Sequence, residues 1–318
     1  MAIGPDTSRI IQHAEILSTH KYFRFIYSLS AVFGVFPFIL HRGRYRISYF
    51  FSVLSVIICI FVGFVAMVLS HLFLFVLPKG KNFVLKAELV LLLCFTVSLS
   101  TMHIITASTS IWRVRAVRQI IGILEEVDAI LSIRLKMDFG LSDLTAISLN
   151  LLLDCWLFYQ TQSIHYIMFG LILVTNIWLV ISQFSVLASL INSRLEGACE
   201  CLNELKMRPD SPYKDQKVAI LSDVHNKLCD AGEILHTAFA WMLTIMIAMC
   251  FVGIIVLTFN IYASYRRDNN FDIRLLLFQD DKLLWILYYF TVTWKIASSS
   301  SQLNQKVTKL CKLDIKII

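Results

Sequence analysis

The segment from Leu144 to Ile191 constrains the fold more than any other part of the chain. It is almost entirely apolar, and Asp154 is its one carboxylate. A continuous helix of about 48 residues would be about 72 Å long, whereas the hydrocarbon core of a bilayer is about 30 Å thick. The segment must therefore fold back on itself, and we expect the turn at the polar residues 160–163.

The composition of the whole chain agrees with a bilayer environment. Of the 318 residues, 57% are hydrophobic and 16% are charged, and the mean hydropathy is +0.70. Soluble domains are about a quarter charged, so a soluble fold of this chain would expose large apolar patches to water. We predict one all-α domain over residues 1–318, a polytopic membrane helical bundle with about six transmembrane helices.

The apolar runs and the basic residues together predict a topology. We expect spans at about residues 49–77, 85–108, 144–159, 164–190, 238–262 and 283–300, with cytosolic helical loops at 109–143 and 191–237. With the N-terminus inside, 22 Lys and Arg residues fall in cytosolic segments and seven fall outside, which together account for all 29. The positive-inside rule therefore places both termini in the cytosol. The basic clusters fit anionic lipid of the inner leaflet, and no nucleic acid is needed to explain them.

Motifs of enzyme chemistry are missing from the sequence. There is no P-loop, no His-Glu-x-x-His helix, no Gly-x-Ser-x-Gly elbow and no dinucleotide glycine fingerprint. The histidines and the eight cysteines show no metal-ligand spacing. We expect no enzymatic activity, no metal and no cofactor.

Polar and aromatic side chains gather in the expected outer half of the spans. An ionisable group there costs a few kcal/mol and so indicates a functional contact. The residues that we expect to line a water-accessible ligand pocket are Asp154, Trp156, Tyr159, His165, Tyr166, Asn176, Trp285 and Tyr288. The alternative for Tyr159, Tyr166 and Trp285 is an anchoring belt at the membrane interface. For Asp154 the alternative to ligand contact is a polar bond between helices.

Short segments along nearly the whole chain resemble the insect gustatory receptor family. They are Tyr27–Ser30, Phe33–Pro37, Trp112-Arg113, Asp128, Gln183-Phe184, Arg194, Leu202-Asn203, Leu221–Leu228 and Leu303–Leu310. The resemblance implies a seven-helix chemoreceptor whose topology is inverted relative to G-protein-coupled receptors. It further implies a ligand-gated cation channel subunit in the plasma membrane of sensory neurons. Such a subunit would detect small-molecule tastants, such as sugars or bitter compounds, within a homo- or hetero-tetramer.

The chain departs from this family at its C-terminal end. The family's seventh helix carries Thr-Tyr, five further residues and then Gln-Phe, and it lines the channel pore, but this sequence has neither the motif nor the helix. The family's pore-lining residues therefore have no counterparts here. We interpret the chain as a truncated gene product, a splice form or a receptor that no longer conducts.

Two other classes of protein are alternatives to a receptor. A secondary transporter of small solutes, the main alternative, would show internal repeats and interrupted helices. The two halves of this chain show no such similarity, and Gly and Pro are scarce within the spans. A membrane enzyme would need acids, bases or metal ligands clustered at one membrane face, and the sequence shows no such cluster.

Overall fold

A computed structural model describes residues 21–32, 38–41, 44–71, 97, 100–131, 164–207, 214–267 and 281–314. Its elements are α2 (Lys21–Val32), β1 (Phe38–His41), β2 (Arg44–Ile47), α3 (Tyr49–His71), α5 (Ser110–Leu131), α7 (Ile164–Met207), α8 (Lys214–Arg267) and α10 (Asp281–Asp314). Residues 100–108 are also helical, and a turn at Thr109 separates them from α5. Apart from one short hairpin, the described elements are helices, and the predicted all-α class is confirmed.

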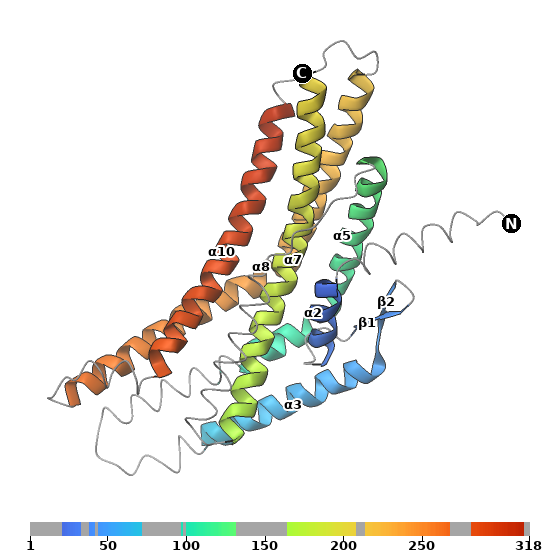
Figure 1. Cartoon of the computed structure of the whole chain (residues 1–318). Helices are drawn as coiled ribbons and strands as arrows, with labels where there is room; N and C mark the ends of the chain where they lie inside the picture. The colour runs from blue at the N-terminus through green and yellow to red at the C-terminus, as the bar shows by residue number, and fades with distance from the viewer. Residues whose placement is uncertain are drawn as a thin grey trace.

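Three long helices form the frame of the molecule (Figure 1). α7, α8 and α10 contain 44, 54 and 34 residues and pack on one another, and α5 packs against α8 and α7. At 1.5 Å per residue these helices are about 66, 81 and 51 Å long, which exceeds the full thickness of a bilayer with its headgroups. α7 and α8 therefore each join an expected span and an expected cytosolic segment in one continuous helix.

The core lies where α5, α7, α8 and α10 meet, and α2 adds Ile26 and Tyr27 to it. On α8 the buried positions recur at spacings of three and four, which gives one continuous apolar seam: Val224, Leu228, Ala231, Leu235, Phe239, Met242 and Met246. On α7, Leu187, Ile191 and Leu195 are fully buried at a spacing of four. Seams of this period favour helices that lie side by side at a shallow crossing angle.

The N-terminal elements attach to this frame through α2, which packs on α7. β1 and β2 form an antiparallel hairpin in which Phe38 is opposite Ile47 and His41 is opposite Arg44. α3 follows and carries large exposed apolar side chains, among them Phe50, Ile60 and Phe64. An exposed apolar face of this size on a 23-residue helix is typical of a surface that faces lipid or another protein.

Two of the described helical segments, Thr175–Leu205 and Gln216–Phe259, are long and apolar enough to cross a bilayer, and Tyr49–Phe64 is a shorter apolar helix. The expected span at 144–159 and most of that at 85–108 lie outside the described residues.

Candidate functional site

Three polar contacts join residues 100–131 to α7, at three successive levels. His103 contacts Asn176, Arg113 contacts Gln183, and Asp128 contacts Arg194. The residue numbers rise together on the two segments, so the segments run parallel. Because most of the surrounding side chains are apolar, these contacts fix the register of the two segments more specifically than packing alone does.

The first level is a buried pair inside two expected spans. The side chains of His103 and Asn176 are 2% and 3% exposed, and Asn176 Nδ2 contacts His103 Nδ1. If the amide donates to Nδ1, the imidazole proton lies on Nε2. His103 Nε2 and Asn176 Oδ1 have no hydrogen-bond partner among the described residues. The pair thus presents one donor and one acceptor in a buried setting, where an unmade hydrogen bond costs about 1–3 kcal/mol.

A cluster of aromatic rings lies between α7 and α10. The ring of Trp178 meets that of Tyr288 edge to face with centroids 6.1 Å apart, and Tyr288 meets Tyr289 at 5.4 Å. Gly253 of α8 lies against the Tyr289 ring, so closely that an added Cβ would be 2.8 Å from Cε2. Trp178 Nε1 is a buried donor that finds no acceptor within the described part of the chain.

Two of the expected pocket residues can be placed from their side chains. Asn176 and Tyr288 are both buried, and they contact His103 and Trp178, respectively. Within the described residues, no hydrogen bond or ring contact brings Asn176 and Tyr288 together. Six expected residues have side chains outside the described part, so their grouping stays a prediction: Asp154, Trp156, Tyr159, His165, Tyr166 and Trp285.

Sequence reasoning did not include His103 and Trp178 among the site residues. His103 carries a signal that could have found it, because it is a polar residue that interrupts an otherwise apolar run. Trp178 carries no such signal, since an indole in an apolar helix is expected to pack in the core or at the interface.

The second level is a buried arginine that contacts three other helical segments. Arg113 is 1% exposed, and its Nη2 and Nη1 donate to the carbonyl oxygen of Thr106 and to Gln183 Oε1, the latter at 3.3 Å. The guanidinium also lies 5.9 Å from the centre of the Phe239 ring on α8. Gln183 Nε2 in turn donates to Ser30 Oγ on α2 at 2.8 Å. Ser30 Oγ in turn donates to the carbonyl oxygen of Ile26 at 2.7 Å.

Burial disfavours the charged form of groups at this level. It lowers the pKa of Arg113 to about 10, although the adjacent Tyr27 opposes this shift. Arg113 therefore remains protonated at neutral pH. Burial also raises the pKa of the Tyr27 phenol, so that Tyr27 stays neutral beside the cation. The level holds a single buried positive charge that is solvated by carbonyl, amide and aromatic groups.

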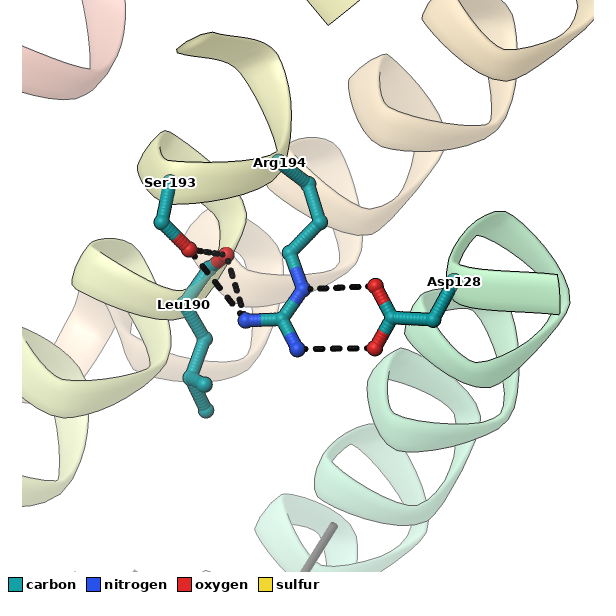
Figure 2. Close-up of polar contacts among 4 residues, drawn as sticks. All are labelled: Asp128, Leu190, Ser193 and Arg194. Carbon is teal, nitrogen blue, oxygen red and sulfur yellow. Dashed lines mark hydrogen bonds and ion pairs between the residues drawn. The ribbon is translucent and has the colours of Figure 1, made fainter. Parts of the chain in front are cut away.

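The third level is a two-point ion pair, shown in Figure 2. Arg194 Nε donates to Asp128 Oδ1 at 3.0 Å, and Nη2 donates to Oδ2 at 2.8 Å. The remaining Nη1 donates to the Leu190 carbonyl and to Ser193 Oγ. The parallel arrangement is the strong geometry for an arginine and a carboxylate.

Further charged residues lie on α5 and α8 near the level of this ion pair. Lys227 of α8 contacts both Glu126 of α5 and Asp223 on its own helix, at 3.2 and 3.3 Å. These two hydrogen bonds raise the pKa of Lys227, that to Glu126 most strongly. Glu125 is half-buried, and burial together with the charge of Asp128 raises its pKa to about 7. No group of three or more metal-ligating side chains occurs within the described ranges.

Long apolar helices that are cross-linked by buried polar contacts define a helical membrane protein. More narrowly, the chain belongs to the 7tm Chemosensory receptor family, whose sequence profile matches residues 23–313. A comparison with curated proteins found no match. The protein is a chemosensory receptor, and the resemblance noted in the sequence is confirmed at the level of the family.

Proposed function

We propose that this receptor is a gustatory receptor of the plasma membrane of sensory neurons, with both termini in the cytosol. It acts as a subunit of a ligand-gated cation channel that detects small molecules and assembles as a homo- or hetero-tetramer. The observation that carries the proposal is the buried His103–Asn176 pair, which has hydrogen-bonding capacity left over within an apolar bundle of a chemosensory receptor.

The chemistry of the pair suggests the kind of ligand. His103 Nε2 supplies a donor in the tautomer described above, and Asn176 Oδ1 supplies an acceptor. A hydroxyl group both donates and accepts, so a neutral hydroxylated molecule such as a sugar can satisfy both atoms. Trp178 and Tyr288 meet between α7 and α10. Their rings offer an aromatic surface against which an apolar part of a ligand can pack.

The three levels of polar contacts can couple ligand binding to channel opening. A ligand that binds one arrangement of His103 and Asn176 more tightly than another shifts the population of the two. Because Arg113–Gln183 and Asp128–Arg194 join the same two segments, a shift between the segments at the first level strains the contacts at the other two. Ion flow would then follow from the pore radius and lining of the assembled channel.

The test is a response assay in cells that express the full chain, alone and with other receptor subunits, against a panel of sugars and bitter compounds. Asn176→Leu and His103→Phe should each raise the ligand concentration for half-maximal response at least tenfold, about 1.4 kcal/mol. Asn203→Leu, at an exposed position of α7, should leave the ligand concentration for half-maximal response unchanged.

Two readouts separate the parts of the proposal. Ligand-induced thermal stabilisation of the purified receptor reports binding, and membrane current reports conduction. If ligand stabilised the receptor but no subunit combination gave a current, the channel part of the proposal would be wrong and the receptor part would stand. If Asn176→Leu and His103→Phe both responded like the parent at normal surface expression, His103 and Asn176 would not be part of the ligand site.

A further inference from the structure

The first half of α5 is a charged face with no acidic residue. Its first three turns contain Arg113, Arg115 and Arg118, whereas the acidic residues Glu125, Glu126 and Asp128 lie in its second half. Arg113 points into the bundle, but Arg115 and Arg118 are exposed. The helix therefore presents positive charge on its outer side over one half of its length only.

A large aromatic side chain extends the same face. Trp112 is 73% exposed. Trp112, Arg115 and Gln119 recur at spacings of three and four, so they lie on one side of the helix, with Arg118 at its edge. The opposite side is buried through Val114, Val117, Ile120, Ile121 and Leu124. The outer face thus combines an indole and two guanidinium groups.

Contacts between helices show that this face lies at the same level as two other exposed tryptophans. Arg113 meets Gln183 of α7 and Phe239 of α8, and Phe184 and Phe239 have ring centroids 5.8 Å apart. Trp241, two residues beyond Phe239, is 81% exposed. Trp112 is one residue from Arg113, about 1.5 Å along α5, and Trp241 is two residues from Phe239, about 3 Å along α8, and these two helices pack on each other.

The third tryptophan is on α10. Ser299 of α10 contacts Ser185 of α7 at 3.2 Å, and Trp294, five residues before Ser299, is 74% exposed. Exposed tryptophans on three helices at one level form the belt that marks a membrane–water interface. Each of them lies on the side of this level that faces the expected spans. Arg115 and Arg118 lie on the other side of it, about 3 and 7.5 Å beyond Arg113 along the helix, which is the depth of a phospholipid headgroup layer.

We propose that the face formed by Trp112, Arg115 and Arg118 binds the headgroup of an anionic phospholipid in the cytosolic leaflet. The exposed Arg115 guanidinium holds the headgroup phosphate by charge-assisted hydrogen bonds, Arg118 adds positive charge beside it, and the Trp112 indole lies along the glycerol and upper acyl chain. The proposal rests on the topology given above and does not depend on the identity of the tastant. It gives the receptor a sensitivity to membrane composition next to the buried Arg113 level.

The experiment is a lipid titration of the purified full chain in detergent, with the midpoint of thermal unfolding as readout. Short-chain phosphatidylserine should stabilise the receptor at lower concentration than short-chain phosphatidylcholine. Arg115→Gln should weaken this effect about fivefold, and the double variant Arg115→Gln, Arg118→Gln about thirtyfold. Lys217→Gln removes a matched exposed positive charge from α8 and should leave the titration unchanged.

Three results would overturn the proposal. Equal stabilisation by the two lipids would show that the face does not select anionic headgroups. An equal loss in Lys217→Gln would show that only the net charge matters. Equal stabilisation by soluble phosphoserine would show an anion site in place of a lipid site. Since both arginines are exposed, the variants should fold, and their unfolding midpoints without added lipid check this directly.

Discussion

Arg194 of α7 and Asp128 of α5 are joined by two parallel hydrogen bonds of 3.0 and 2.8 Å, with Arg194 only 4% exposed and Asp128 17% exposed. Nη1 of the guanidinium donates to groups of its own helix, and the ion pair with Asp128 ties Arg194 to α5. This ion pair is therefore a specific link between the two helices at the level farthest from the His103–Asn176 pair.

Replacing Asp128 by Ala removes the two-point ion-pair partner of the buried Arg194. We expect the free energy of unfolding to fall by about 3 kcal/mol, because a buried charge then loses this partner. Thermal unfolding of the purified receptor measures the change. Glu126→Ala removes an exposed carboxylate of the same helix from its pair with Lys227 and should change stability by less than about 1 kcal/mol. Equal effects of the two substitutions would contradict a special role for the Arg194–Asp128 pair.

Gly253 gives the second prediction, because α8 and α10 approach closely there. A methyl group at position 253 would lie 2.8 Å from Tyr289 Cε2, so Gly253→Ala should lower the free energy of unfolding by about 1–3 kcal/mol through overpacking. Gly232→Ala, on the same helix, meets nothing within 4 Å and should be neutral or stabilising by up to about 1 kcal/mol. Tyr289→Leu should restore the stability of Gly253→Ala. No recovery in this double variant would show that the ring is not the obstacle.

The class of fold was predictable from the sequence, because apolar runs of bilayer length leave few alternatives. The residues that carry the family resemblance were also visible, among them Arg113, Asp128, Gln183 and Arg194. Which of these residues pair with each other was not predictable from the sequence. Arg113 and Gln183 are 70 residues apart and Asp128 and Arg194 are 66 apart, so their contacts depend on the register between two helices. Apolar periodicity identifies the buried face of a helix but leaves its axial position against a neighbour undetermined.

The candidate site was predictable to a smaller extent for the same reason. Asn176 stood out as a polar residue within an apolar run, and it is buried. Its partner His103 lies 73 residues away on another segment, and only the packing of that segment on α7 brings the two together. Tyr288 was chosen for its aromatic character, but its neighbour Trp178 has no sequence feature that separates a ligand-site indole from one in the core.

The hydrogen bond between Gln183 and Ser30 gives the third prediction, which concerns the attachment of α2. Gln183 links Arg113 to Ser30, and both Gln183 and Ser30 are fully buried. In a double-mutant cycle, Gln183→Ala and Ser30→Ala should each be destabilising, with a coupling free energy of about 0.5–1.5 kcal/mol. Asn203→Ala, at an exposed position of α7, should stay within about 0.5 kcal/mol of the parent. Strictly additive effects of Gln183→Ala and Ser30→Ala would show that the hydrogen bond contributes nothing measurable.

The fourth prediction concerns the pH dependence of stability near Glu125. Burial, assisted by the charge of Asp128, raises the pKa of Glu125 from 4.5 to about 7 in the folded protein. The folded state therefore binds the proton more tightly than the unfolded chain does. Between these two pKa values the folded state holds more protons, so stability falls as the pH rises through this window and levels off above pH 7.

Glu125→Gln removes this titration and keeps the shape of the side chain. At pH 8 the variant should be more stable than the parent, because the parent then holds a half-buried negative charge beside Asp128. Well below pH 4.5 the two proteins should have the same stability, since the parent carboxyl is then neutral in both the folded state and the unfolded chain. Unfolding midpoints measured across this range test the prediction. Glu200→Gln makes the same change of charge at an exposed position and controls for the change in net charge. If the stability of Glu125→Gln changed with pH in the same way as that of the parent, the proton taken up on folding would belong to another group.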